Sequence, residues 1–396
     1  MKIRFIVVLS ALVLLSSGIY AQEVANPITT AVPFLLIAPD ARAGAMGDVG
    51  VASSPDDFSL YWNPAKYAFC EKDFGVGIGY MPWLRGLVND IGLASVSGYK
   101  KFGDRQAIGA SLRFFSMGQV TFTDINGVEL AEVKPTEWTI DATYSRKFTN
   151  TLSGAVSGRF IYSNLIPINY TDYDVRPGTS VAADVALYYN KELNIEGLVG
   201  SWFSFGLNIS NIGAKMSYNS NSIQRDFIPT NLRLGPSFTM DIDEYNRLMF
   251  EVDFNKLLVP TPPVYGTDSL GNTDKTIISK GMNPDVSPIT GMLQSFYDAP
   301  YGFKEELQEV SIAGAVEYWY NKLFAIRGGY FYESKYKGDR QYFTMGAGIR
   351  YNVFGLDFSY LVPVKRNNPL QNTMQFTLLF NFDQAGKKDK QNSGND

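Results

Sequence analysis

The stretch QAIGASLRFF, from Gln106 to Phe115, alternates apolar residues with polar or small ones. One face of the extended chain carries Ile108, Ala110, Leu112 and Phe114, and the other carries Ala107, Gly109, Ser111 and Arg113. A period of two is the sequence signal of a β-strand. Aliphatic side chains opposite an arginine are typical of a strand that separates lipid from a polar lumen.

The same pattern recurs along the chain. In EVSIAGAVEYWY, Glu317 faces away from Val316, and in NTMQFTLLFNF, Gln375 faces away from Phe376. We count fourteen such segments, at about 73–81, 89–102, 104–117, 136–148, 151–165, 177–190, 201–212, 229–241, 244–255, 305–320, 322–334, 340–353, 354–363 and 371–382. Many begin or end in Tyr, Trp or Phe, as strands do at two membrane interfaces. The sequence therefore predicts an all-β fold, a 14-stranded antiparallel transmembrane β-barrel.

The connections between these segments alternate in length. Short ones such as 149–150 and 242–243 follow even-numbered segments, and longer ones such as 118–135 and 256–304 follow odd-numbered segments. Bacterial outer-membrane barrels have short periplasmic turns and longer outer loops. We therefore expect both termini in the periplasm. A soluble β-sandwich would explain the alternation but not this rhythm.

The predicted organisation has four parts. Residues 1–21, with a basic start and an apolar core, are typical of a secretory signal peptide; the alternative is a retained membrane helix, for which the apolar core is short. Residues 22–72 precede the first strand as a plug segment, and residues 73–382 form the barrel in the cell outer membrane. Residues 383–396 form a polar periplasmic tail that is typical of disorder.

The composition excludes several classes of protein. The chain has no His and a single Cys, Cys70, so that a His-dependent triad, a His-ligated metal site and an internal disulfide framework are all excluded. The net charge of −4 does not favour nucleic acid as a partner. No catalytic constellation, metal site or cofactor site is predicted, and the chain is not expected to be an enzyme.

The stretch DARAGAMGDVGVASSPDDFSLYWNPA, Asp40 to Ala65, carries Gly44, Gly47 and Gly50. Their spacing differs from that of nucleotide-binding loops, and no Gly-Lys-Ser/Thr follows. Asn63-Pro64 is a turn signal. We expect the glycines to allow a close approach of the backbone to the barrel wall, with Asn63, Pro64 and Ala65 closing the plug.

The connection 256–304 is longer than most structureless loops. Its first part, VPTPPVYGTDSLGNTDKT, is predicted to be an irregular surface excursion, whereas Ser287-Pro288 opens a short amphipathic helix. Exposed apolar residues there would mark a contact surface; they are Met292, Leu293, Phe296, Tyr297 and Phe303. The alternative is that these side chains fold back over the barrel mouth.

Two motifs carry a resemblance to a known family. The stretch from Ala41 to Ala65 resembles the N-terminal segment of FadL-like outer-membrane proteins, which have fourteen-stranded barrels. The closer similarity, over nearly the whole mature chain, is to the PorV (LptO) family of the type IX secretion system of Bacteroidota. Residues 26–53 and the stretch GMLQSFYDAPYGFKEELQEV, residues 291–310, carry it. The first motif is shared with other FadL-like proteins, and the second is more specific.

The resemblance implies a carrier of exported proteins. Its partners would be cargo with type IX C-terminal signal domains, a SprA-type translocon, a PorU-type sortase, and outer-membrane lipid or lipopolysaccharide. The alternative is a FadL-like transporter of hydrophobic small molecules, with an apolar pocket in the lumen. A third hypothesis is a structural scaffold for outer-membrane assembly.

Overall fold

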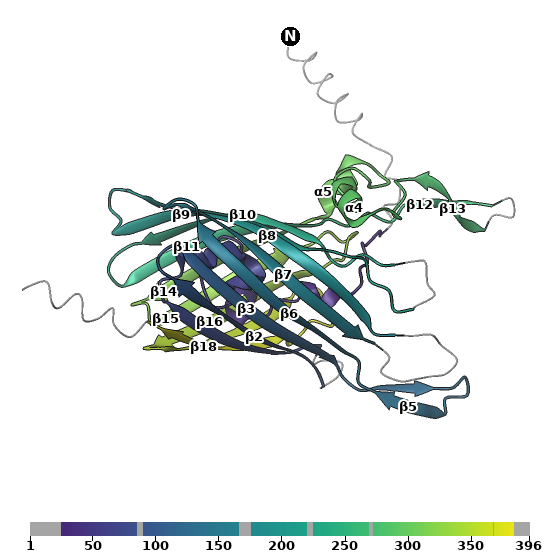
Figure 1. The fold of residues 1–396 in the computed structure, drawn as a ribbon, viewed down its shortest axis with the longest axis horizontal. Coiled ribbons are helices and arrows are strands. Elements are labelled where there is room, and N and C mark those ends of the chain that lie inside the picture. Colours follow the sequence, from purple (N-terminus) through teal and green to yellow (C-terminus); the bar gives the residue numbers. More distant parts are fainter. Residues whose placement is uncertain are drawn as a thin grey trace, which may run out of the picture.

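The computed structural model describes residues 25–84, 90–165, 176–219, 225–268, 272–366 and 368–383 (Figure 1). Fourteen strands form the wall of a barrel: β1 (Phe74–Pro82), β2 (Ile91–Phe102), β3 (Gln106–Met117), β6 (Thr136–Lys147), β7 (Leu152–Asn164), β8 (Gly178–Leu193), β9 (Gly200–Gly213), β10 (Asn231–Asp241), β11 (Asn246–Leu257), β14 (Val310–Tyr320), β15 (Phe324–Tyr332), β16 (Gln341–Tyr351), β17 (Phe354–Pro363) and β18 (Met374–Phe382).

Each of these strands pairs antiparallel with its neighbour along the wall, and β1 closes the barrel on β18 with Phe74 opposite Phe382. A closed barrel has no sheet edge, so every wall strand finds a partner on both sides inside the membrane. The predicted 14-stranded antiparallel barrel is confirmed.

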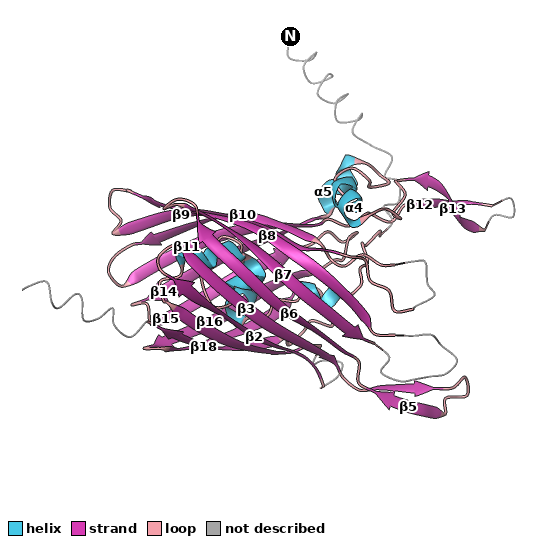
Figure 2. Ribbon diagram, viewed as in Figure 1, coloured by secondary structure: helices cyan, strands magenta, loops and turns pink. Residues whose placement is uncertain are grey.

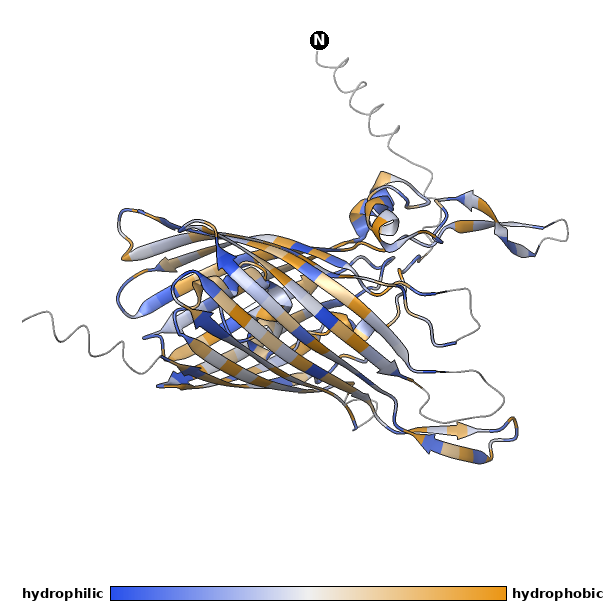
Figure 3. Cartoon of the chain, viewed as in Figure 1, coloured by the Kyte–Doolittle hydropathy of each residue, from blue (hydrophilic) through white to orange (hydrophobic). Residues whose placement is uncertain are grey.

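The two faces of each strand differ as the alternation predicts. On β3, Ile108 is 45 % exposed and points outward, whereas Arg113 is 2 % exposed and points into the lumen. On β14, Glu317 is buried and Val316 is exposed. The blue and orange residues that alternate along the strands in Figure 3 follow the same rule.

The two ends of the barrel carry different connections. Short turns such as 103–105, 321–323 and 352–353 lie at one end, which we call the short-turn end. Longer connections such as 214–230 and 258–309 lie at the other, the long-loop end, on the right in Figure 1. The predicted rhythm of long and short connections is thus present in the structure.

Several connections contain structure that the sequence did not predict. The connection after β3 forms a hairpin of β4 (Val120–Thr123) and β5 (Glu129–Val133). The predicted irregular excursion is also a hairpin, of β12 (Val264–Thr267) and β13 (Thr273–Lys280), in which Tyr265 pairs with Ile278. The prediction was wrong here because β-branched and aromatic residues cross-pair beyond the prolines.

The last part of the long connection is helical. Helix α4 (Pro288–Gln294) begins as predicted, with the Ser287 hydroxyl accepting a hydrogen bond from the Thr290 backbone N–H at 3.2 Å. Helix α5 (Phe303–Gln308) occupies residues that we assigned to the strand starting at 305, and β14 starts only at Val310. The helix prevails because it places acidic residues on one face, against two lysines of the barrel rim.

The N-terminal segment lies inside the barrel as four short helices: η1 (Pro33–Leu36), α2 (Ala41–Gly44), α3 (Ser59–Trp62) and η2 (Pro64–Phe69) (Figure 2). At the long-loop end, the Asn26 backbone N–H donates to the Tyr336 carbonyl at 2.9 Å. At the short-turn end, the Asp73 backbone N–H donates to the Phe382 carbonyl at 3.2 Å. The segment therefore runs through the lumen from one end to the other.

The two ends of the described chain do not lie together, as the expectation of two periplasmic termini requires. The described chain begins at the long-loop end and ends at Asp383, which pairs with Lys72 at the short-turn end. The reason is that the N-terminal segment crosses the lumen once before β1, while the fourteen wall strands return the chain to where β1 starts. The predicted signal peptide, residues 1–21, and the tail beyond Asp383 lie outside the described residues.

Within the described residues, no helix combines the length and the hydropathy needed to span a bilayer. The same residues contain no group of three or more His, Cys, Asp or Glu side chains placed to hold a metal ion.

Candidate functional site

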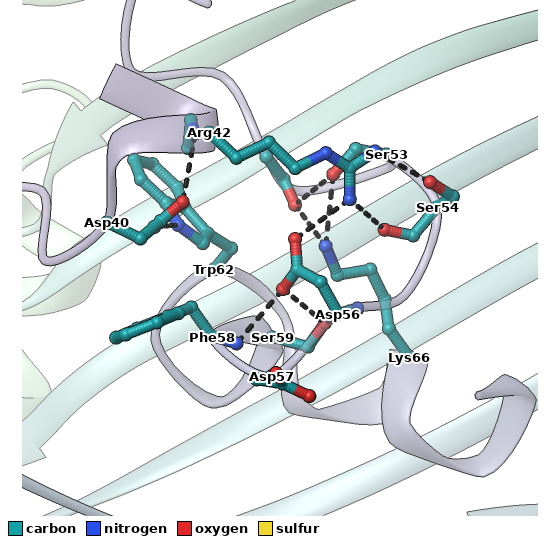
Figure 4. A network of polar contacts seen from close by, with 12 residues as sticks. Asp40, Arg42, Ser53, Ser54, Asp56, Asp57, Phe58, Ser59, Trp62 and Lys66 are labelled. Atoms are coloured by element: carbon teal, nitrogen blue, oxygen red, sulfur yellow. Dashed lines mark hydrogen bonds and ion pairs between the residues drawn. The ribbon is translucent and has the colours of Figure 1, made fainter. Parts of the chain in front are cut away.

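A network of ion pairs fixes the N-terminal segment in the lumen (Figure 4). The Arg42 guanidinium lies 2.9 Å from the Asp56 carboxylate and 2.8 Å from the Glu317 carboxylate on β14. The Lys66 ammonium donates to the Gly50 carbonyl at 2.8 Å and to the Ser53 hydroxyl at 3.1 Å. All of these charged groups are largely buried, so each needs a charged or polar partner to be stable there.

Gly44 and Gly47 lie where the backbone closely approaches wall strands, whereas Gly50 lies against another part of the N-terminal segment. Gly47 has φ of +69°, its N–H donates to the Thr344 hydroxyl at 2.7 Å, and a Cβ there would lie 2.9 Å from the Tyr330 backbone nitrogen. At Gly50 a Cβ would lie 2.7 Å from the Trp62 ring, and at Gly44 it would overlap the amide of Gln375.

Asn63, Pro64 and Ala65 come together at the start of η2. The Asn63 side chain accepts from the Ala65 N–H at 3.1 Å and donates to the Val51 and Leu187 carbonyls, both at 2.9 Å. Pro64 occupies the first helical position, where a missing N–H costs nothing. The Ala65 carbonyl accepts from hydroxyls on two wall strands.

Two wall carboxylates bind the glycine-containing stretch, and our sequence analysis missed them. On β11, Asp253 accepts hydrogen bonds from the N–H groups of Gly50 and Val51, at 2.9 and 3.1 Å. Glu251 accepts from the N–H groups of Ala52 and Ser53, at 2.6 and 2.8 Å. Two carboxylates two residues apart on a predicted strand share a face, and that spacing was the available signal.

Two further groups in the lumen segment titrate abnormally. Burial, reinforced by the neighbouring charge of Asp56, raises the pKa of Asp57 to about 8. Burial also raises the pKa of the Cys70 thiol well above its ordinary value, so this side chain is a packed thiol rather than a thiolate. Asp56 itself caps the turn, accepting from the Phe58 N–H at 3.1 Å.

The long-loop end carries an apolar surface on and around α4 and α5. Phe303 is 75 % exposed and Leu307 is 58 % exposed, and Leu293, Phe296 and Tyr297 are exposed as well, whereas Met292 is only partly so. We define the outer patch as Ile289, Leu293, Phe296, Tyr297, Tyr301, Phe303 and Leu307. These side chains are exposed to solvent, which favours a contact surface over the alternative that they fold back over the barrel mouth.

Three residues of the outer patch, Ile289, Tyr301 and Leu307, were not among those that we predicted for this surface. Leu307 stands four residues after Phe303, the spacing that places two residues on one helix face. That signal was hidden because we assigned residues from 305 onward to a strand.

A cavity of about 550 Å³ lies between the start of the N-terminal segment and the wall, near the long-loop end. Its lining is mainly apolar, with Phe34, Met81, Trp83, Phe115, Leu361 and Leu370 among the residues that face it. Charged residues of both signs also line it, among them Lys337, Arg340, Asp48 and Glu333. The buried Glu137, which has one carboxylate oxygen without a partner, lines it as well.

These features define a class of protein, an outer-membrane β-barrel whose own N-terminal segment fills much of the lumen and whose long-loop end displays an apolar patch. Residues 20–264 match the family described as "Type IX secretion system protein PorV". The chain belongs to this family. The matched range ends before α4 and α5, so the family match does not extend to the outer patch.

Solved structures with a similar fold include hydrocarbon channels. A TodX deltaS2S3 mutant monoaromatic hydrocarbon channel is 12 % identical, with a TM-score of 0.51 over 87 % of this chain and 99 % of that one. The Pseudomonas putida toluene transporter TodX is 10 % identical, with a TM-score of 0.48 over 90 % and 98 %. A Pseudomonas aeruginosa FadL homologue is 11 % identical, with a TM-score of 0.41 over 91 % and 99 %. The first of these similarities shows the fold alone.

No curated protein matches the chain.

Proposed function

We propose that this barrel binds the C-terminal signal domain of exported cargo through the outer patch, and that it carries the cargo from a SprA-type translocon to a PorU-type sortase. Membership of the PorV family supports a role in type IX secretion. The observation that carries the docking role is the outer patch, because seven large apolar side chains gathered on one loop are rarely left exposed without a partner.

The proposal orients the barrel with its long loops outside the cell. Longer loops on the extracellular side are the rule for outer-membrane barrels. The outer patch then faces the compartment in which cargo leaves the translocon and meets the sortase at the outer-membrane lipid surface.

The chemistry of the patch suits a reversible carrier. Burying a large apolar side chain is worth about 1.5–3 kcal/mol, and association and side-chain ordering offset part of that gain. A few such contacts give affinities near the micromolar range, about −8 kcal/mol. A carrier that must release its cargo needs affinity of this order and no catalytic group.

The test is a capture experiment with purified barrel and a purified cargo signal domain. The variant Leu293→Ser/Tyr297→Ser/Phe303→Ser removes three patch side chains, and the control Ile125→Ser removes an exposed side chain from the β4–β5 hairpin. We expect the triple variant to lose capture of the signal domain and the control variant to retain it. Heat-modifiable migration on gels should show that both variant barrels are folded. Undiminished capture by the triple variant would exclude the patch as the docking site.

The lumen segment has a separate proposed role as a plug. Residues 25–73 occupy much of the lumen. Within them, Asn63 hydrogen-bonds to Val51 of the glycine stretch and to Leu187 of β8. Replacing Asn63 and Pro64 together by Ala removes these hydrogen bonds. We expect the variant to conduct ions across planar bilayers and the parent barrel not to. Equal conductance of the parent and the variant would argue against the plug.

The cavity near the long-loop end favours a second candidate function, transport of hydrophobic small molecules. Proteins described as monoaromatic hydrocarbon channels share this fold. Phe115→Trp and Leu370→Trp distinguish the two candidate functions, because each narrows the cavity and leaves every side chain of the outer patch in place. The carrier function predicts unchanged cargo capture in both variants. A transporter predicts uptake of a hydrophobic fluorescent probe by the parent and its loss in the variants.

A further inference from the structure

Helix α5 has an unusual distribution of side chains. A surface helix ordinarily buries its apolar face and exposes its polar face. In α5 the arrangement is reversed: Glu305 and Glu306 are buried, whereas Phe303 and Leu307 are exposed. The helix is therefore held to the barrel by its acidic face, which leaves its apolar face free.

Two lysines of the barrel rim bind this acidic face. The ammonium of Lys256, at the end of β11, lies 3.1 Å from the Glu306 carboxylate and 2.6 Å from the Glu309 carboxylate. The ammonium of Lys337, in the connection between β15 and β16, lies 2.6 Å from the Glu305 carboxylate and 3.0 Å from the Glu309 carboxylate. We call these five residues the acidic anchor.

Further hydrogen bonds support the three carboxylates of the anchor. Glu306 accepts from the Ala299 N–H at 2.8 Å, Glu305 from the Tyr301 N–H at 2.9 Å, and Glu309 from the Thr261 hydroxyl at 2.6 Å. A buried ionic cluster is stable only when its charges are paired and hydrogen-bonded in this way.

The start of the N-terminal segment joins the same anchor. The Asn26 side-chain amide donates to the Glu305 carboxylate at 3.1 Å and to the Pro262 carbonyl at 3.0 Å. Its backbone N–H donates to the Tyr336 carbonyl, next to Lys337. Three parts of the chain that are far apart in sequence thus meet at one polar cluster beneath α5.

We propose that Lys256 and Lys337 are positioning residues, which hold α5 by its acidic face so that Phe303 and Leu307 are presented to a binding partner. The partner is the cargo signal domain of the proposed function. The inference rests on the proposed function only for the identity of this partner. Neither lysine belongs to the patch, and both act through the glutamates of α5.

The first measurement is hydrogen–deuterium exchange of the purified full-length barrel without any cargo. In Lys337→Gln the Glu305 and Glu309 carboxylates lose a buried ammonium, and we expect exchange of the α5 amides to accelerate roughly a hundredfold or more. Exchange in the barrel strands should not change. The matched control is Lys365→Gln, because Lys365 pairs with Asp339 at the same end of the barrel but is exposed.

The second measurement is the affinity of the same variants for the cargo signal domain. We expect Lys337→Gln to weaken binding about tenfold or more and Lys337→Arg, which keeps the charge, to restore most of it. Should Lys337→Gln fail to fold, Glu305→Gln probes the same anchor from the helix side. Unchanged α5 exchange in both variants, or unchanged affinity despite faster exchange, would overturn the proposal.

The two proposals fail in different ways. The exchange measurement requires no partner, so it reports on the anchor even if the cargo function is wrong. The proposed function fails when the triple patch variant, whose anchor is intact, still captures cargo.

Discussion

Arg42 of the N-terminal segment donates two hydrogen bonds to Glu317 of β14, at 3.0 and 2.8 Å, although 275 residues separate them in sequence. Two parallel hydrogen bonds between a guanidinium and a carboxylate are the strong form of this pair. Glu317 also pairs with Arg327 at 2.6 Å, and Arg327 with Asp357 at 2.8 Å. The pair therefore joins the lumen segment to a charge network of the wall.

Replacing Arg42 should destabilise the barrel strongly. In Arg42→Ala the Asp56 and Glu317 carboxylates lose a buried partner, which typically costs about 3–5 kcal/mol. The temperature at which the folded band disappears in heat-modifiability gels measures the loss. Lys72→Ala is the control, because the Lys72–Asp383 pair is exposed and such pairs contribute about 0–1 kcal/mol. Equal shifts in the two variants would contradict this account.

Gly47 should resist substitution more than another glycine of similar backbone conformation. Gly47 and Gly127 have φ of +69° and +81°, but a Cβ at Gly47 meets the Tyr330 backbone whereas one at Gly127 meets nothing within 4 Å. Both Ala variants acquire backbone strain of about 1–3 kcal/mol, and only Gly47→Ala adds a clash. The unfolding temperature should therefore fall further in Gly47→Ala than in Gly127→Ala. Equal falls would mean that the lumen segment moves to accommodate the added Cβ at Gly47.

Asp57 should make the stability of the lumen segment depend on pH. Its pKa rises from 3.8 to about 8, so between these values the folded state binds a proton that the unfolded chain releases. The contribution of Asp57 therefore falls as pH rises towards 8. Asp57→Asn, which stays neutral, should flatten the decline in unfolding temperature between about pH 4 and pH 8. A pH profile parallel to that of the parent would refute this assignment.

The course of the N-terminal segment can be tested by labelling in intact cells. Ala25 and Asp383 are exposed at opposite ends of the barrel, and the native Cys70 is buried. With the long loops outside, a membrane-impermeant maleimide should label Ala25→Cys but label Asp383→Cys only after the cells are lysed. Labelling of Asp383→Cys alone in intact cells would mean that the short-turn end, not the long-loop end, lies outside the cell.

The wall of the barrel was predictable because the alternation of apolar and polar residues within each strand indicates which side chains face lipid and which face the lumen. The alternation that places Ile108 outside and Arg113 inside needs no knowledge of the rest of the chain. The start of α4 was predictable for the same reason, since Ser287 and Pro288 form a helix start by themselves.

The contacts of the lumen were not predictable, because they join residues far apart in sequence. Nothing near Arg42 indicates that its partner is Glu317, and nothing near Glu305 indicates Lys337. The same limit explains the error at α5. Glu305 and Glu306 look solvent-facing in sequence, and their ion pairs with the rim lysines, which favour their burial, join residues far apart in the chain.

The most direct test of the central claim is site-specific photo-crosslinking in cells that secrete cargo. A photoreactive amino acid replaces Phe303 in the outer patch, and in a second strain it replaces Ile125 at the tip of the β4–β5 hairpin. We expect crosslinks from position 303 to proteins that share a C-terminal signal domain, and few or none from position 125. Equal crosslinking from both positions, or none from position 303, would contradict the claim that the outer patch receives the cargo.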